Sequence, residues 1–222
     1  MFEEFFMKNV LKAFGIIALV AVIGFWAVSC GNDDGGGGGN TTIESGAEVI
    51  YYSNITNLAE AKSATNFGFG QNMYSYNNGI EPLSNFLDGS TSVTVNNGKI
   101  TIILGTPKSV YLQNFRIGEG ATVNPSNAKG FVLSYFLTSD GKYTLVCGKE
   151  DGSVLAHLYY FDRDVTAKGT VTNENTGETT TINYSLKKGW QYFTSSENDI
   201  GTPFTELPSG FKWIVLGNGY RE

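Results

Sequence analysis

Residues 93–104 read VTVNNGKITIIL, and this stretch carries the clearest structural signal in the chain. Asn97-Gly98 in its middle can adopt the positive φ angles that a tight hairpin turn requires. The arms on both sides are rich in β-branched residues, which strands favour. The stretch therefore predicts a β-hairpin.

The same kind of pattern continues along the chain. Residues 131–138 and 143–147 flank an Asp140-Gly141 pair, which predicts a second hairpin turn. Residues 154–161 are almost continuously apolar, as in a strand buried on both faces. In residues 179–186, Ile182, Tyr184 and Leu186 share one face of a strand. Further strands are expected at 48–54, 110–117, 165–172, 190–195 and 211–216.

Sequential hairpins imply an antiparallel sheet. Helix signals are few; residues 57–65 form the best candidate, with Asn57 as a cap. The expected fold is therefore all-β. An antiparallel β-sandwich is preferred, and a small up-and-down β-barrel is the alternative. We expect residues 47–222 to form a single β-rich domain.

The N-terminal segment has the features of an export signal. Lys8 and Lys12 precede an uncharged, almost wholly apolar run at 13–28. A membrane-spanning helix needs about 20 such residues, whereas a basic start and a shorter apolar run are typical of a secretory signal. Glu3 and Glu4 do not suit such a start, so we expect translation to begin at Met7. Residues 1–29 are then the signal peptide.

The end of this run, Ala27-Val28-Ser29-Cys30, resembles the lipobox of bacterial lipoproteins, in a relaxed form similar to that of spirochaetal lipoproteins. The resemblance covers only the N-terminal segment. It implies that Cys30 is lipidated, becomes the first mature residue and anchors the protein in the bacterial cell envelope, on the periplasmic or the surface face of the outer membrane. Residues 30–46, rich in glycine, then form a flexible linker. The alternative is an uncleaved anchor helix with an incidental cysteine.

Composition narrows the choice of partners. The net charge is −6 and no basic cluster occurs, which argues against nucleic acid as a partner. The chain has two cysteines and one histidine. With Cys30 committed to lipid, Cys147 has no partner for a disulfide within the chain. The single histidine, His157, argues against a histidine-based metal site.

Candidate catalytic side chains are few. There is no G-x-S-x-G motif, His157 lies in the apolar run, and Cys147 has the setting of a buried structural thiol. Asp162 and Asp164 are weak candidates for a calcium site, but the interposed Arg163 favours local ion pairs. We therefore assign no catalytic residue and no cofactor. A glycosidase pair of carboxylates stays open.

Aromatic side chains are the most suggestive candidates for ligand contacts. Trp190 and Tyr192 lie on one face of a predicted strand, and Trp213 lies on another strand. Tyr52 follows Tyr51, so that the two rings point to opposite faces. Rings on a sheet can stack against sugars, but they also fill sandwich cores.

The sequence favours a binding or structural role over catalysis. The expected protein is a lipid-anchored module of the cell envelope that contacts the membrane through its lipid and a glycan or protein through its β-rich domain. Two alternatives remain. One is a carrier of a small apolar ligand in a barrel cavity, and the other is a carbohydrate-active hydrolase.

Overall fold

The computed structural model describes residues 40–52, 55–69, 82–117, 120–172, 177–195 and 202–217. The predicted signal peptide, Cys30 and the linker up to Gly39 lie outside these residues. Among the described residues, unit 1 consists of residues from 112–132 and 151–210, and unit 2 of residues from 40–111, 133–150 and 211–217. No helix in these ranges is long and apolar enough to span a membrane.

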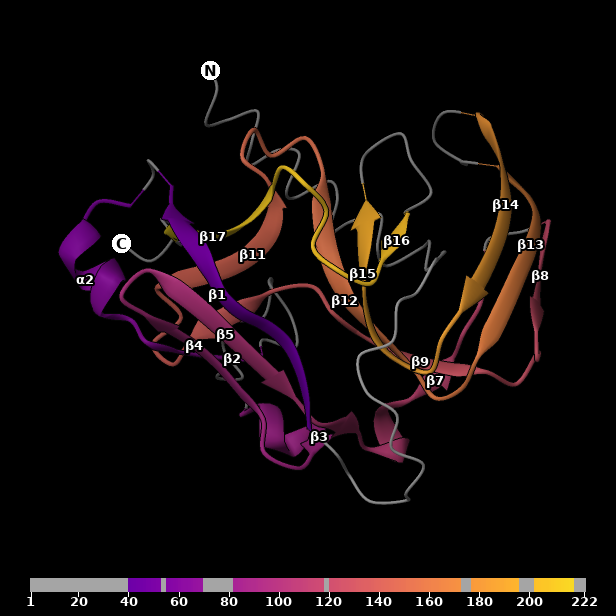
Figure 1. Cartoon of the computed structure of the whole chain (residues 1–222), viewed down its shortest axis with the longest axis horizontal. Helices are drawn as coiled ribbons and strands as arrows, with labels where there is room; N and C mark the ends of the chain where they lie inside the picture. Colours follow the sequence, from indigo (N-terminus) through magenta and orange to yellow (C-terminus); the bar gives the residue numbers. More distant parts are fainter. Residues whose placement is uncertain are drawn as a thin grey trace. The chain divides into compact units, whose positions relative to one another are not determined.

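Unit 2 contains a closed ring of seven strands. Their order is β10-β2-β4-β5-β1-β17-β11, and pairing between β10 and β11 closes the ring. Figure 1 shows β4, β5 and β1 side by side. The elements of unit 2 are β1 (Thr41–Tyr51), α2 (Leu58–Ser63), β2 (Asn66–Phe69), η2 (Leu83–Asn85), β3 (Leu87–Asp88), β4 (Ser92–Asn96), β5 (Lys99–Leu104), β6 (Thr106–Pro107), η3 (Ser109–Tyr111), β10 (Phe136–Thr138), β11 (Tyr143–Lys149) and β17 (Phe211–Gly217).

Alternate residues of these strands point into the ring. In β5, the side chains of Ile100, Ile102 and Leu104 are fully buried. Directly opposite residues in an antiparallel pair share a face, so the rows on neighbouring strands point the same way. Trp213 is the largest of these buried side chains and lies opposite Cys147 of β11. Because even eight strands leave an interior just wide enough for side chains, this ring encloses a packed core.

Unit 1 has two sheets that share one core. In the first sheet β12 pairs with β15 and β9, β16 pairs with β15, and β7 pairs with β9; the second has the order β14-β13-β8. The apolar core between them draws side chains from both sheets, including Phe161 of β12 and Ile182 of β14. The elements of unit 1 are β7 (Gln113–Asn114), β8 (Ala121–Asn124), β9 (Lys129–Leu133), β12 (Leu155–Phe161), β13 (Val165–Thr172), β14 (Thr179–Leu186), β15 (Gly189–Ser195) and β16 (Pro203–Phe204).

The prediction of an all-β fold is confirmed, with α2 the one α-helix in the described residues. The hairpin at 93–104 is present as β4 and β5, and Asn97 and Gly98 have the expected positive φ angles of 52° and 72°. Asn57 caps α2, as predicted. The barrel and the facing sheets, considered as alternatives for one domain, occur in separate units.

Three expectations about local structure are wrong. Residues 110–117 do not form one strand; a 3-10 turn, η3, is followed by the two-residue β7. The first arm of the second hairpin is only β10, because β9 ends at Leu133 and pairs elsewhere. The first strand begins at Thr41 rather than Glu48. In each case long-range pairing, which local patterns do not report, decides where the strand begins and ends.

Candidate functional site

Three aromatic rings lie on one face of the larger sheet in unit 1. They come from neighbouring strands: Phe131 from β9, Tyr160 from β12 and Trp190 from β15. The ring of Trp190 lies 5.4 Å from that of Tyr160 and 6.2 Å from that of Phe131, edge to face in both cases. Tyr160 is buried, whereas Phe131 and Trp190 are half-buried. We call these three residues the aromatic face.

The strand alternation of β12 separates the aromatic face from the core. Successive side chains of a strand point to opposite sides. Tyr159 and Phe161 enter the core of unit 1, where Phe193 joins them. Tyr160, between them, therefore points to the other side. Trp190 lies directly opposite Tyr160 in the register of β12 and β15, so the two rings share that side.

The four aromatic residues singled out in the sequence have different surroundings. Trp190 belongs to the aromatic face. Tyr192 is only 2% exposed, and Trp213, also 2% exposed, packs against Phe136 in the ring of unit 2. Within the described part of the chain, the indole Nε1 of Trp213 has no hydrogen-bond partner. Tyr52 is half-buried, and its backbone N–H donates to Val215 at 2.9 Å.

Sequence reasoning assigned no ligand contact to two members of the aromatic face. In the adjacent pair Tyr159 and Tyr160, alternation along a strand places one ring on each side but does not specify which ring faces the core. Phe131 lay in a stretch expected to pair as a hairpin arm. Only the pairing of β9 with β12 brings it beside Trp190.

An ion pair borders the strand end next to Tyr160. The guanidinium of Arg163 donates to both carboxylate oxygens of Asp162, and the backbone N–H of Lys129 donates to the same carboxylate at 2.9 Å. Burial opposes the charge of Asp162, but these donors outweigh it and hold the pKa of its carboxyl below the usual value. Arg163 also donates to Asn127 at 3.2 Å. The local ion pair expected at Arg163 is present.

Asp164 has separate partners. Its carboxylate accepts from the Lys187 ammonium at 2.6 Å and from the backbone N–H of Lys188 at 2.9 Å. These two donors, the lysine ammonium first, lower its pKa. Asp162 and Asp164, the weak metal candidates, are thus engaged by protein donors. Across the described ranges, no group of three His, Cys, Asp or Glu side chains is placed to hold a metal ion.

The histidine and the described cysteine lie in the interior. His157 is 3% exposed in β12, and Cys147 is 2% exposed in β11. Burial, with a smaller contribution from the charge of Glu44, raises the pKa of the Cys147 thiol well above its ordinary value. A buried thiol held protonated is a poor nucleophile. The geometry therefore favours structural roles for both residues.

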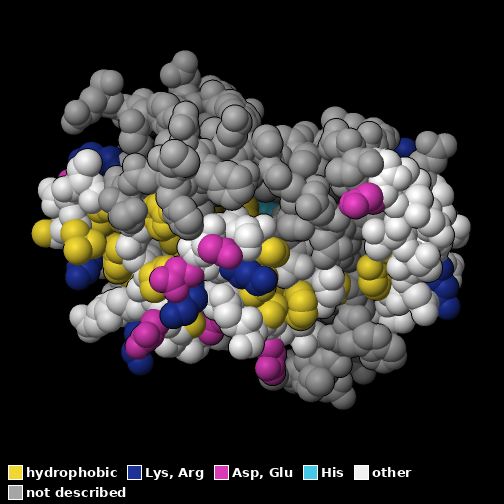
Figure 2. Space-filling view, turned by 90° about the horizontal axis from the view of Figure 1, so that it is seen from above, with side chains coloured by type: hydrophobic (Ala, Val, Ile, Leu, Met, Phe, Trp, Pro, Cys, Tyr) yellow, Lys and Arg dark blue, Asp and Glu magenta, His cyan; other side chains and the backbone are white. Residues whose placement is uncertain are grey.

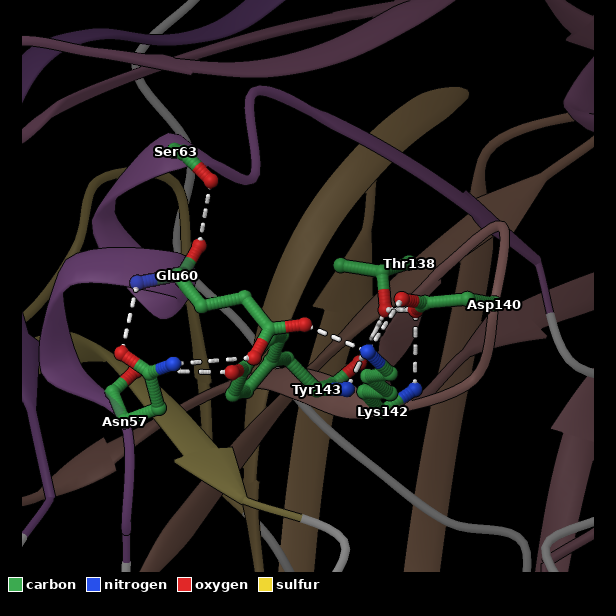
Figure 3. A network of polar contacts seen from close by, with 7 residues as sticks. All are labelled: Asn57, Glu60, Ser63, Thr138, Asp140, Lys142 and Tyr143. Carbon is green, nitrogen blue, oxygen red and sulfur yellow. Dashed lines mark hydrogen bonds and ion pairs between the residues drawn. The ribbon is translucent and has the colours of Figure 1, made fainter.

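A polar network in unit 2 joins α2 to the turn between β10 and β11 (Figure 3). Glu60 of α2 pairs with Lys142 in that turn, and this partner raises the pKa of the lysine. The Asp140 carboxylate accepts from the Thr138 hydroxyl at 2.6 Å and from the Lys142 backbone N–H at 3.0 Å. The network holds two segments that are distant in sequence. Because each of its groups has a partner within it, we interpret it as structural.

We expect Asn57→Ala to destabilise unit 2 by about 1 kcal/mol, the usual cost of losing an N-cap. The side chain of Asn57 accepts from the Glu60 backbone N–H at 3.1 Å and donates to the Glu60 carboxylate at 3.3 Å. Its loss removes the N-cap of α2 and one donor to the Glu60 carboxylate, the group that pairs with Lys142. Thermal unfolding followed by circular dichroism measures the effect. Asn57→Ser keeps an accepting oxygen at the N-cap without placing a second negative charge beside Glu60, and it should stay close to wild type. Equal losses in the two variants would contradict the capping role.

The described residues form no single-sign charged patch on the face drawn in Figure 2. On the face drawn in Figure 2, acidic and basic side chains of the described residues are both visible among hydrophobic ones. Comparisons of the chain with protein-family models, with curated proteins and with solved structures found no match. Inference about function therefore depends on the lipobox-like segment and on the side chains described above.

Proposed function

We propose that this protein is a lipid-anchored binding module of the bacterial cell envelope. The observation that carries the proposal is the Ala27-Val28-Ser29-Cys30 segment at the end of a short apolar run. One acyl chain binds a membrane only marginally, whereas two or more anchor it stably, at about 0.8 kcal/mol per buried methylene. A lipidated Cys30 would therefore hold the β-rich part of the chain at a membrane surface.

The ligand contact of this module is the aromatic face. Half-buried Trp190 and Phe131 offer apolar ring surface without conformational freedom, and aromatic residues are enriched where proteins bind partners. The Asp162–Arg163 pair, which follows directly after the end of β12 at Phe161, adds charged hydrogen-bonding groups close in sequence to Tyr160. Rings combined with a few polar groups suit a glycan, whose faces are apolar and whose edges carry hydroxyls.

The geometry gives less support to the two alternatives. A carrier requires an internal cavity, but the ring of unit 2 is filled by side chains such as Trp213, Phe136 and Ile102. A hydrolase requires two acids that face a shared space. Asp162 and Asp164 are instead each bound to a separate cation.

The anchor is tested by comparing wild type with Cys30→Ala in cells labelled with radioactive palmitate. We expect wild type to carry label and to sediment with membranes, and Cys30→Ala to lose the label and appear in the soluble fraction. Cys147→Ala, which removes the other cysteine, should behave as wild type. If Cys30→Ala remains firmly membrane-bound, the apolar run is a retained helix and the lipid anchor is wrong.

The ligand contact is tested separately with a glycan array that includes bacterial cell-wall fragments. Trp190→Ala should weaken binding about tenfold or more, as expected for an aromatic residue central to an interface. Tyr111→Ala, which removes a half-buried ring in unit 2, is the control and should bind as wild type. Binding that survives Trp190→Ala unchanged would exclude the aromatic face.

A further inference from the structure

Strand β14 is an edge strand in the three-stranded sheet of unit 1. Among the described strands it pairs with β13 alone, and Figure 1 shows β14, β13 and β8 in that order. It is 8 residues long and pairs with β13 at every position without a register shift. The other edge of this sheet, β8, has 4 residues, and β16 at an edge of the larger sheet has 2. Thus β14 is the longest regular edge in unit 1 as described.

The sequence of β14 has none of the usual protection against strand pairing. It reads TTTINYSL, with no charge, proline or glycine. Proteins commonly guard exposed edges with charged residues, proline, bulges or short strands, because an edge presents backbone groups to any other strand. Ile182 and Leu186 secure one face of β14 in the core. No described strand pairs with the second edge of β14.

The residues that flank β14 carry opposite charges. Glu178 precedes the strand, and Lys187 and Lys188 follow it. Lys187 is engaged by Asp164, whereas the side chain of Lys188 is exposed. If two copies of β14 lie antiparallel, the acidic end of each meets the basic end of the other. A strand with this charge order is complementary to itself.

We infer that β14 pairs antiparallel with β14 of a second copy of this chain, about a two-fold axis at Asn183. Opposite residues in an antiparallel pair share a face. In a register centred on one residue, core-side residues of one copy therefore lie opposite core-side residues of the other, and outer residues lie opposite outer residues. In this register Ile182 of each copy lies opposite Tyr184 of the other, on the core side. Thr181 lies opposite Ser185 on the outer side. In such an isologous contact both copies use the same surface. The two three-stranded sheets become one continuous sheet, and the assembly is complete with two copies.

Cysteine cross-linking tests the register in the full chain. Asn183→Cys places one thiol of each copy at the axis, so mild oxidation in membranes should yield a covalent dimer. The matched control is Lys168→Cys, on the same outer face of β13 and directly opposite Asn183. Its thiols lie one strand further from the axis on each side and should not cross-link. The wild-type chain reports any background from Cys30 and Cys147.

A charge exchange tests the pairing without a covalent bond. Each dimer contains two contacts between Glu178 and the basic end, so Lys188→Glu turns two attractions into repulsions. We expect it to raise the dissociation constant about tenfold, measured by sedimentation equilibrium of the full chain in density-matched detergent. Adding Glu178→Lys to Lys188→Glu should restore wild-type association. If Lys188 had only a structural role within its own copy, adding Glu178→Lys would not restore association.

Three results would overturn the inference. The wild-type chain could remain monomeric at every concentration, or Asn183→Cys and Lys168→Cys could cross-link equally. Alternatively, Asn183→Cys could cross-link in membranes only to another protein, in which case a partner strand occupies the edge. The binding proposed for the aromatic face uses the other sheet of unit 1, so its own failure leaves these outcomes unchanged.

Discussion

Replacing Phe161 with alanine is expected to destabilise unit 1 by about 3–5 kcal/mol, the usual cost of truncating a buried phenylalanine. The side chain is fully buried in the core between the two sheets. Its ring lies 4.9 Å from that of Phe115 and 6.1 Å from that of Phe193. These neighbours belong to different segments, so they cannot all move to fill the space. A loss of this size is a large part of the total stability of a typical domain.

Hydrogen exchange followed by mass spectrometry is the suitable measurement, because it reports on each strand separately. In Phe161→Ala, peptides from β12, β13 and β14 should exchange faster than in wild type. Phe161→Leu keeps most of the apolar volume and should cost less. The exposed Val110→Ala is the control, since its side chain is 80% exposed and its removal should change little. Unchanged protection of β13 and β14 in Phe161→Ala would show that this ring does not join the two sheets.

Replacing Gly105 with alanine is expected to cost unit 2 about 3 kcal/mol or more, at the upper end of overpacking effects. A Cβ atom at this position would lie 1.5 Å from the backbone oxygen of Asp88 and 2.7 Å from its carbonyl carbon. Both atoms belong to the backbone, so no change of side-chain rotamer relieves the clash. The Gly105 N–H also donates to the Thr91 hydroxyl at 3.1 Å, which fixes the position of the glycine. The pairing of β3 with β6, where Asp88 lies opposite Thr106, would have to open.

Urea unfolding of Gly105→Ala measures this cost, and the soluble yield reports a failure to fold. Gly130→Ala is the matched control. Its Cβ would come no closer than 3.2 Å to another heavy atom, the backbone oxygen of Tyr160, so a shift of a few tenths of an ångström relieves it. Similar unfolding curves for the two variants would mean that the close approach of Gly105 to Asp88 is not maintained in solution.

Elements with local causes were predictable. The hairpin of β4 and β5 follows from Asn97-Gly98, and α2 follows from the Asn57 cap. Strand β12, with every residue buried, follows from its continuous apolar run. In these cases the chemistry of adjacent residues is sufficient, because the interactions concerned span only a few positions.

Pairings between distant segments could not be predicted in the same way. The parallel pairing of β1 with β17 brings the first and last described strands together, although sequential hairpins had indicated antiparallel neighbours. The aromatic face depends on the pairing of β9 with β12. Many alternative partners would satisfy the same alternation of polar and apolar residues, so packing of the whole unit makes the choice.

The sequence by itself determined the all-β class, the turns, the short helix and the lipobox-like segment at Cys30, because each depends on residues within a short stretch. Only the tertiary structure decided that Tyr192 and Trp213 are buried while Trp190 joins Phe131 and Tyr160, and that Asp162 and Asp164 are bound by separate cations. An alternating strand specifies two faces but not which positions on each face will be covered, as Tyr192 and Trp190 show on one face of β15. That choice depends on the apolar area buried when distant strands pack together.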